Sequence, residues 1–182
     1  DLSSGNVISL GVGEPDFSTP WVVREEAIHS LEKGMTSYTS NMGLLELRQS
    51  IAHYLEERFH ASYQPEDEIM ITSGVSQGVD LALRLLLNPG DEVIILEPAY
   101  VCYEPLVLLT GGQVKRVDTS KTSFIPEASA IEEQISPHTK AIILCSPNNP
   151  TGAVIPKKTL QSIAKLAKKH DIWVISDEIY GE

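Results

Sequence analysis

Three short, uninterrupted runs of apolar residues limit what this chain can fold into. They are residues 93–96 (VIIL), 141–144 (AIIL) and 172–175 (IWVI). A strand that is apolar at every position is covered on both faces of its sheet, which is typical of parallel strands joined by crossover helices. The sequence therefore predicts an α/β fold with a mostly parallel sheet and helices on both of its faces.

The segments around these runs alternate between helical and strand patterns. Apolar spacing, with Pro and Gly at the ends, predicts helices at 21–34, 43–60, 76–87, 103–110, 129–135 and 157–170. Apolar and β-branched runs predict strands at 68–73, 92–96, 113–117, 140–145 and 172–176. This order is that of successive strand–helix–strand units, which build a parallel sheet.

The balance of charge argues against a nucleic-acid partner. The 182 residues hold 25 Asp and Glu but 14 Lys and Arg, a formal net charge of −11 at pH 7, whereas nucleic-acid binding needs clustered cations. Five lysines share one helical segment, which we interpret as a solvated helix face: Lys157, Lys158, Lys165, Lys168 and Lys169. Since no apolar run is long enough to cross a bilayer, we also expect no membrane partner.

The two cysteines, Cys102 and Cys145, are too few for a disulfide scaffold. Cys145 ends one of the apolar runs and is expected to be buried in a strand. No spacing of Cys and His fits a zinc site, so we expect no metal. This use of cysteine is typical of a protein in a reducing compartment, and we expect a cytoplasmic location.

Candidate binding residues follow the expected strands, where ligands bind in an open α/β sheet. Gly74, Val75 and Ser76 come between a strand and a helix, and their free N–H groups and the helix dipole would favour a phosphate. The same residues would also suit a turn glycine with Ser76 as a plain N-cap. Tyr100 follows the next strand, where it could stack on an aromatic ligand or pack within a loop.

The last two expected strands are followed by an amide, a carboxylate and a phenol. Asn149 lies in a turn and could serve as a fixed hydrogen-bond donor or simply as a turn residue. Asp177 could pair with a protonated ring nitrogen or be a strand-end or helix-capping aspartate. Tyr180 could donate a hydrogen bond to a phenolate-like oxygen or be a core tyrosine. Near the N-terminus, Gly13 lies in a segment that could let the backbone approach a ligand closely, for instance a carboxylate, or that could be a simple loop.

Five segments together carry a resemblance to a known family. They are residues 13–17 (GEPDF), Tyr38 with Gly43 and residues 47–48 (LR), residues 73–77 (SGVSQ), 146–152 (SPNNPTG) and 176–180 (SDEIY). In this order they resemble the class I/II aminotransferases, which are fold type I pyridoxal-phosphate enzymes, and most of all the aspartate aminotransferases of bacteria and archaea. The likeness covers essentially the whole chain and corresponds to the N-terminal part of these enzymes.

The resemblance implies a role for each candidate at the phosphate end of the cofactor, pyridoxal 5′-phosphate. Gly74, Val75 and Ser76 would hold the phosphate. Tyr38 would reach the phosphate of a neighbouring subunit, so a homodimer is the expected working unit. Gly13 would offer its backbone N–H to the carboxylate of the substrate. The expected organisation is an N-terminal segment with the substrate loop (1–42), followed by part of the cofactor-binding α/β domain (43–182).

At the ring end, the resemblance implies that Tyr100 stacks on the pyridine, while Asn149 and Tyr180 hydrogen-bond the ring hydroxyl oxygen. Asp177 would pair with the pyridine nitrogen and keep it protonated. Asn149, Asp177 and Tyr180 are therefore the candidate catalytic residues. The implied reaction is transfer of an amino group between an amino acid and a 2-oxo acid.

Two alternatives share these motifs. One is another fold type I pyridoxal-phosphate chemistry, such as that of a carbon–sulfur lyase or a cyclopropane-forming synthase. The other is an aminotransferase-like sensor domain of a transcription regulator. The family's Schiff-base lysine and a second carboxylate-binding arginine lie beyond the D-E-x-Y motif, whereas this sequence stops at Glu182. We therefore expect part of a longer enzyme, and no transamination by these 182 residues alone.

Overall fold

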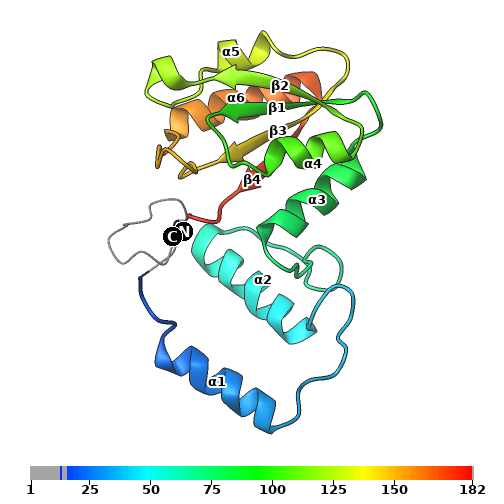
Figure 1. Ribbon diagram of the computed structural model, residues 1–182, viewed down its shortest axis with the longest axis vertical. Coiled ribbons are helices and arrows are strands. Elements are labelled where there is room, and N and C mark those ends of the chain that lie inside the picture. Colours follow the sequence, from blue (N-terminus) through cyan, green and yellow to red (C-terminus); the bar gives the residue numbers. More distant parts are fainter. Residues whose placement is uncertain (1–12, 14–15, 182) are drawn as a thin grey trace, which may run out of the picture.

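A computed structural model describes residue 13 and residues 16–181 (Figure 1). Six α-helices, one 3-10 helix and four strands are found in this part of the chain. In chain order they are α1 (Trp21–Glu32), α2 (Leu45–Phe59), α3 (Val75–Leu86), β1 (Glu92–Glu97), α4 (Tyr103–Leu109), β2 (Gln113–Asp118), η1 (Ser120–Thr122), α5 (Ala128–Glu132), β3 (Thr139–Cys145), α6 (Lys157–His170) and β4 (Trp173–Asp177).

The four strands form one sheet in the order β2-β1-β3-β4, and every neighbouring pair is parallel. Two of the apolar runs seen in the sequence, in β1 and β3, lie side by side at its centre. In the register of β3 and β4, Cys145 is opposite Asp177, so the carboxyl ends of these two strands meet at the same edge of the sheet.

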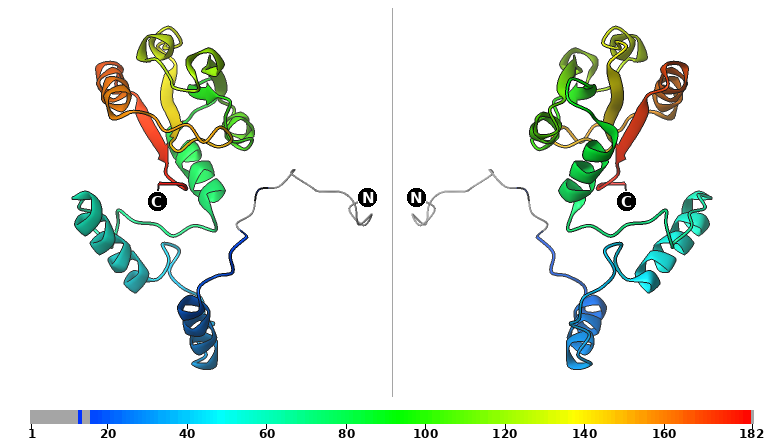
Figure 2. Two further views of the ribbon diagram at one scale, coloured as in Figure 1. Left: turned by 90° about the vertical axis from the view of Figure 1, so that its left-hand side faces the viewer. Right: turned by 90° about the vertical axis from the view of Figure 1, so that its right-hand side faces the viewer.

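Two apolar cores lie on opposite faces of the sheet, because successive side chains of a strand point to opposite sides. Val93 and Ile95 of β1 pack with α3 and α4, whereas Ile94 and Leu96 pack with α5 and α6. Figure 2 shows α3 and α4 on one side of the strands and α6 on the other. The predicted fold, a mostly parallel sheet with helices on both faces, is confirmed.

The strand predicted at 68–73 is wrong. These residues follow an irregular path, although Ile69 is buried. A strand exists only as part of a hydrogen-bonded ladder, and none of the four strands in the described part of the chain pairs with this segment. The Ile71 N–H donates instead to the Met42 carbonyl, at 3.0 Å.

The third apolar run is also less covered than predicted. β4 is an edge strand, and the side chains of Trp173 and Val174 are 64% and 39% exposed. An edge position leaves one side of the strand without a neighbour, and apolar residues in such a strand need not be buried. Within β4 the buried residue is Asp177, with 6% exposure.

The two N-terminal helices extend away from the sheet (Figure 1). No side chain of α1 is buried, and α2 buries Arg48 alone. The Arg48 guanidinium donates hydrogen bonds to the carbonyls of Pro65 and Glu66, which fixes the turn after α2. The apolar face expected for α2 is only partly covered, since Leu44 and Leu47 are 46% and 44% exposed. The division at residue 42 stays a prediction.

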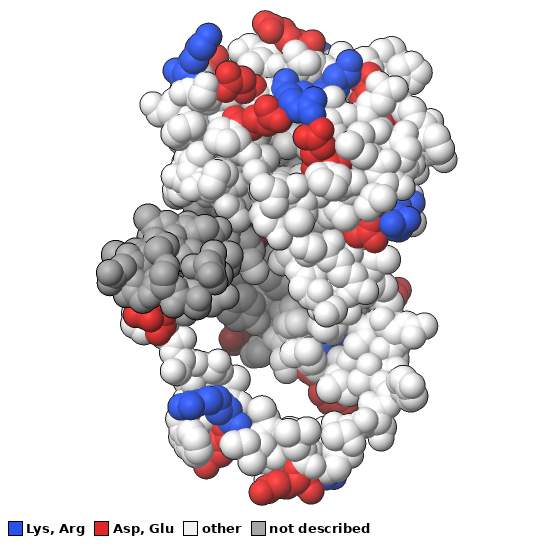
Figure 3. Space-filling model, in the orientation of Figure 1, with Lys and Arg blue, Asp and Glu red and all other residues white. Residues whose placement is uncertain are grey.

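The surface is consistent with the mixed composition. On the face in Figure 3, Lys and Arg are interspersed with Asp and Glu over the sheet unit, without a continuous basic patch among the described residues. The five lysines of α6 are exposed. Of the helices that the structure describes, none combines the length and the apolar character of a membrane span.

Helix α3 begins at a backbone conformation that requires glycine. Gly74 precedes the helix with φ 84° and ψ 164°, a region that is essentially restricted to glycine because a Cβ would clash with the backbone. Gly78, one turn into the same helix, has no such conformation, and a Cβ there would lie 3.5 Å from the Thr72 hydroxyl oxygen, an ordinary contact.

The two glycines should therefore respond differently to the same change. Gly74→Ala is expected to lower the free energy of unfolding by about 1–3 kcal/mol through backbone strain. Gly78→Ala is expected to leave it unchanged or raise it by about 0.4–1 kcal/mol, because alanine restricts the unfolded chain. Urea denaturation followed by circular dichroism measures both, and equal effects would contradict the backbone assignment.

A matched pair of leucines tests the core beneath α3. Leu83 is fully buried, whereas Leu85 in the same helix is 85% exposed. Leu83→Ala should lower the free energy of unfolding by about 2–5 kcal/mol, since it removes buried methyl groups and leaves a cavity. Leu85→Ala should change it by no more than about 0.5 kcal/mol. Comparable losses in the two variants would show that α3 does not pack on the sheet as described.

Candidate functional site

A cavity of about 230 Å³ lies at the carboxyl ends of β3 and β4. Six of the residues selected from the sequence line it: Val75, Ser76, Tyr100, Asn149, Asp177 and Tyr180. They come from the start of α3, the loops after β1 and β3, and the end of β4. Parallel strands bring these distant segments together because their carboxyl ends share one edge of the sheet.

Asp177 is the buried carboxylate of this cavity. One of its oxygens, Oδ2, accepts a hydrogen bond from the Tyr103 phenol at 2.5 Å. The other, Oδ1, accepts one from the Ile179 N–H at 3.2 Å. With both oxygens bound and 6% of the residue exposed, the carboxylate has a fixed orientation in the cavity.

Asn149 and Tyr180 come together on the rim of the same cavity. The Asn149 amide donates to the Tyr180 phenol oxygen across 3.4 Å, a long and weak contact. The neighbouring Asn148 has a structural role, since its side-chain oxygen accepts hydrogen bonds from the N–H and hydroxyl of Thr151. Asn148 thus stabilises the turn, and Asn149 is the amide that faces the cavity.

The first turn of α3 contributes the anion-binding end of the site. Ser76 lies within the helix, after Val75, so the N-cap reading of this serine is wrong; the N-cap is Gly74, which has no side chain to bond the free N–H groups. The helix dipole and these N–H groups favour an anion at this point. Next to this helix end, the Gln77 side-chain oxygen accepts a hydrogen bond from the Ser73 N–H, at 2.5 Å.

Three of the selected residues do not line this cavity: Gly74, which immediately precedes the lining residue Val75, Tyr38 and Gly13. The Tyr38 side chain is fully exposed, and the role expected for it requires a second subunit. Gly13 is described, but Glu14 and Pro15 of its motif lie outside the described residues. The roles of Tyr38 and Gly13 stay predictions.

Sequence reasoning missed three residues that line the cavity, namely Tyr103, Cys145 and Ile179. Tyr103 begins α4 and is buried, with 3% exposure. Its ring packs edge-on against that of Tyr100, with the centroids 5.6 Å apart. The only signal in the sequence was the position of Tyr103, three residues after Tyr100 and therefore near the same edge of the sheet.

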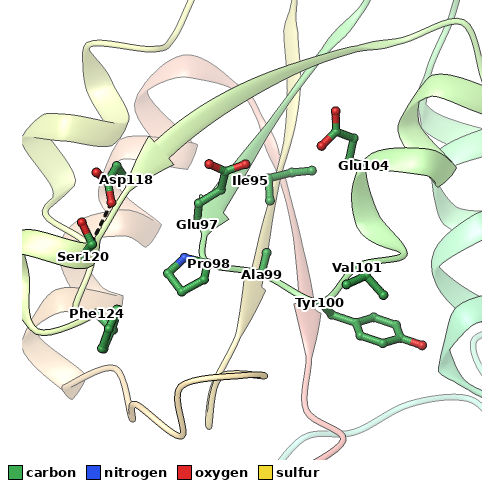
Figure 4. A pocket seen from close by; sticks show the side chains of 10 residues that line it. All are labelled: Ile95, Glu97, Pro98, Ala99, Tyr100, Val101, Glu104, Asp118, Ser120 and Phe124. Atoms are coloured by element: carbon green, nitrogen blue, oxygen red, sulfur yellow. Dashed lines mark hydrogen bonds between the residues drawn. The ribbon is translucent and has the colours of Figure 1, made fainter. Parts of the chain in front are cut away.

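A larger cavity, of about 560 Å³, lies on the other side of Tyr100 (Figure 4). Its carboxylates make it a poor place for an anion. Hydrogen bonds from Ser120 hold the pKa of Asp118 below its ordinary value, so this group is ionised at neutral pH. Glu97 and Glu104 are engaged by Arg116. In the figure the ring of Tyr100 points away from these acids.

No group of three or more His, Cys, Asp or Glu in the described residues is arranged to hold a metal ion. The smaller cavity instead offers one buried carboxylate, an aromatic ring, an amide, a phenol and a helix N-terminus. This set suits a flat ring compound that carries a positive charge at one point and an anionic substituent at another.

Comparison with known proteins identifies the same family that the sequence motifs resemble. Residues 5–182 match the family model of aminotransferase class I and II. A putative aminotransferase, YugH, from Bacillus subtilis is 53% identical over 177 residues, which are 97% of this chain and 46% of that protein. The aspartate aminotransferase of Thermotoga maritima is 43% identical over 176 residues, 96% of this chain and 46% of that enzyme.

Solved structures agree with the fold. The aromatic aminotransferase from Pyrococcus horikoshii superimposes with a TM-score of 0.92 at 44% identity, over 95% of this chain and 47% of that one. The aspartate aminotransferase from Thermus thermophilus with maleate gives a TM-score of 0.88 at 41% identity, over 91% and 44%. The chain spans about half the length of the curated relatives it matches. On the family match over residues 5–182, the chain belongs to aminotransferase class I and II.

Proposed function

We propose that this chain is part of an enzyme that uses pyridoxal 5′-phosphate to move an amino group between an amino acid and a 2-oxo acid. The observation that carries the proposal is the single cavity lined by both Ser76 and Asp177. These residues are 101 positions apart in the sequence, and one small ring compound with a phosphate could contact both.

The start of α3 would hold the phosphate. Val75 and Ser76 offer backbone N–H groups at a helix N-terminus, and the Ser76 hydroxyl adds a side-chain donor. Gly74, whose own N–H donates to the Thr72 carbonyl at 2.9 Å, would contribute by shaping the turn before the helix. No Lys or Arg is among the described residues that line the cavity. Backbone dipoles and neutral donors would therefore supply most of the attraction for the phosphate.

The opposite end of the cavity would hold the ring. Tyr100 would stack on its face, and Asn149 and Tyr180 would donate hydrogen bonds to its hydroxyl oxygen. The carboxylate of Asp177 would keep the ring nitrogen protonated, because a nearby opposite charge favours the charged form. When bound, pyridoxal 5′-phosphate supplies an electron sink for the α-carbon of the amino acid and carries the amino group to the second substrate.

The relatives support the class of substrate. Their names describe aspartate, aromatic amino acid and N-acetyl-LL-diaminopimelate aminotransferases. What these activities share is an amino acid paired with an oxo acid, which is the class we propose for this protein. Gly13 would bind the substrate carboxylate, Tyr38 would serve the cofactor of a second subunit in a homodimer, and the protein would work in the cytoplasm.

We also infer that the lysine that anchors the cofactor lies outside these 182 residues, since none of the described residues that line the cavity is a lysine. If so, the chain alone should bind pyridoxal 5′-phosphate without a covalent bond. Borohydride reduction of the mixture, followed by mass spectrometry, is expected to leave scattered, substoichiometric adducts. A single stoichiometric lysine adduct would show instead that the chain carries its own anchor.

Binding of pyridoxal 5′-phosphate measured by equilibrium dialysis tests the assignment of the two ends. Ser76→Ala should weaken binding about tenfold, because it removes a hydrogen bond to a charged group. The same variant should bind pyridoxal, which lacks the phosphate, as the unchanged chain does. Ser162→Ala in α6, where the hydroxyl bonds the Lys158 carbonyl, is the matched control. Equal binding of the phosphate ester by the Ser76 and Ser162 variants would refute the phosphate site.

A further inference from the structure

Tyr103 is one of three residues of the cavity, with Cys145 and Ile179, that neither the sequence nor the proposed cofactor contacts account for. It comes from α4, whereas its hydrogen-bond partner Asp177 ends β4, 74 positions away. The rest of β4 is largely exposed at the edge of the sheet, with Trp173 at 64%. The Tyr103 phenol therefore joins the one buried group of an edge strand to a helix that packs on the sheet.

The phenol is held in place from several directions. Tyr103 is only 3% exposed, and it belongs to the apolar core that includes Val107 and Cys145. Its N–H donates to the Tyr100 carbonyl at 3.1 Å, and the two rings meet at 81°. Because the ring cannot swing, its hydroxyl reaches Asp177 along one direction.

The phenol is also a permanent donor. Burial raises the pKa of Tyr103 far above its ordinary value, and the carboxylate of Asp177 raises it further, because a second negative charge beside the first is unfavourable. The Cys145 thiol, which faces the same hydroxyl, acts in the same direction. Tyr103 is therefore neutral and protonated at neutral pH.

We propose that Tyr103 is a positioning residue: its phenol fixes the Asp177 carboxylate in the orientation that presents it to a cationic ring nitrogen in the cavity. The inference rests on the proposed function. The segment whose Tyr100 would stack on the ring also carries Tyr103, which fixes the orientation of the Asp177 carboxylate that would pair with the ring nitrogen. The segment from Tyr100 to Tyr103, which leads into α4, thus fixes two contacts of the ring relative to each other.

This role differs from a purely structural tie between α4 and β4. A tie would contribute to folding whether or not position 177 is charged. A positioning role acts on a ligand only through the charge of Asp177, and it disappears when that charge is removed. Because the two roles predict different coupling between the residues, a double-mutant cycle separates them.

The cycle uses the affinity for pyridoxal 5′-phosphate, measured by equilibrium dialysis at one pH and salt concentration. Tyr103→Phe keeps the ring and removes the hydroxyl, and Asp177→Asn keeps the shape and removes the charge. We expect Tyr103→Phe to weaken binding about tenfold in the unchanged chain, the effect of losing a hydrogen bond to a charged group. In the Asp177→Asn background the same change should weaken binding less than about twofold.

Tyr63→Phe is the matched control, since this phenol is 46% exposed and lies outside the cavity; it should bind as the unchanged chain does. Circular dichroism establishes that each variant is folded. A second measurement needs no substitution at position 103: the ¹³Cζ NMR signal of Tyr103 should shift when pyridoxal 5′-phosphate binds, because its acceptor then shares charge with the ring. An unmoved signal in saturated protein would overturn the inference.

The outcomes separate the inference from the function on which it rests. If the unchanged chain shows no saturable binding, or if Asp177→Asn binds equally well, the proposed function itself fails, and the inference with it. If Asp177→Asn weakens binding but Tyr103→Phe does not, or weakens it by the same factor in both backgrounds, only the positioning role of Tyr103 is refuted.

Discussion

The pairing of β4 with β3 is the interaction on which the candidate site depends. Among the strands that the structure describes, β4 has one neighbour, and its side chains other than Asp177 are largely exposed. The register sets Asp177 beside Cys145, at the end of a strand that is itself buried between two apolar cores. The carboxylate thus has a fixed place because Ile142 and Ile143 anchor β3 from opposite faces, although its own strand contributes little to the core.

The fold could be predicted from the sequence where burial alone determines it. Continuous apolar runs are typical of central strands, and β1 and β3 are the two central strands of this sheet. The run at 172–175 is just as apolar but lies at the edge of the sheet. An apolar run alone does not reveal where its strand lies in the strand order. The error at 68–73 has a related cause. The residue pattern of a strand can be seen locally, but a strand forms only when a neighbouring strand hydrogen-bonds to it.

The site could be predicted where one rule applied, namely that ligands bind at the carboxyl ends of parallel strands. This rule selected Asn149 and Asp177, which the structure brings to one cavity together with Ser76. Ser76 was selected by the same rule, but the strand expected before it at 68–73 is not found in the structure, and it reaches the cavity from the start of α3. It could not select Tyr103, because that residue opens a helix and acts on a partner 74 positions away. Only the three-dimensional packing of α4 reveals the contact.

The electrostatics of the two neighbouring cavities explain why the smaller one suits an anion. The chain has a net charge of −11, so the field of the whole protein repels a phosphate. Attraction must therefore be local, and in the smaller cavity the start of α3 supplies a partial positive charge near Ser76. Asp118 leaves the larger cavity acidic, while Arg116 is already occupied by Glu97 and Glu104. The larger volume thus lacks what an anion needs, and Tyr100, which borders both cavities, separates the acidic space from the one that offers free N–H groups.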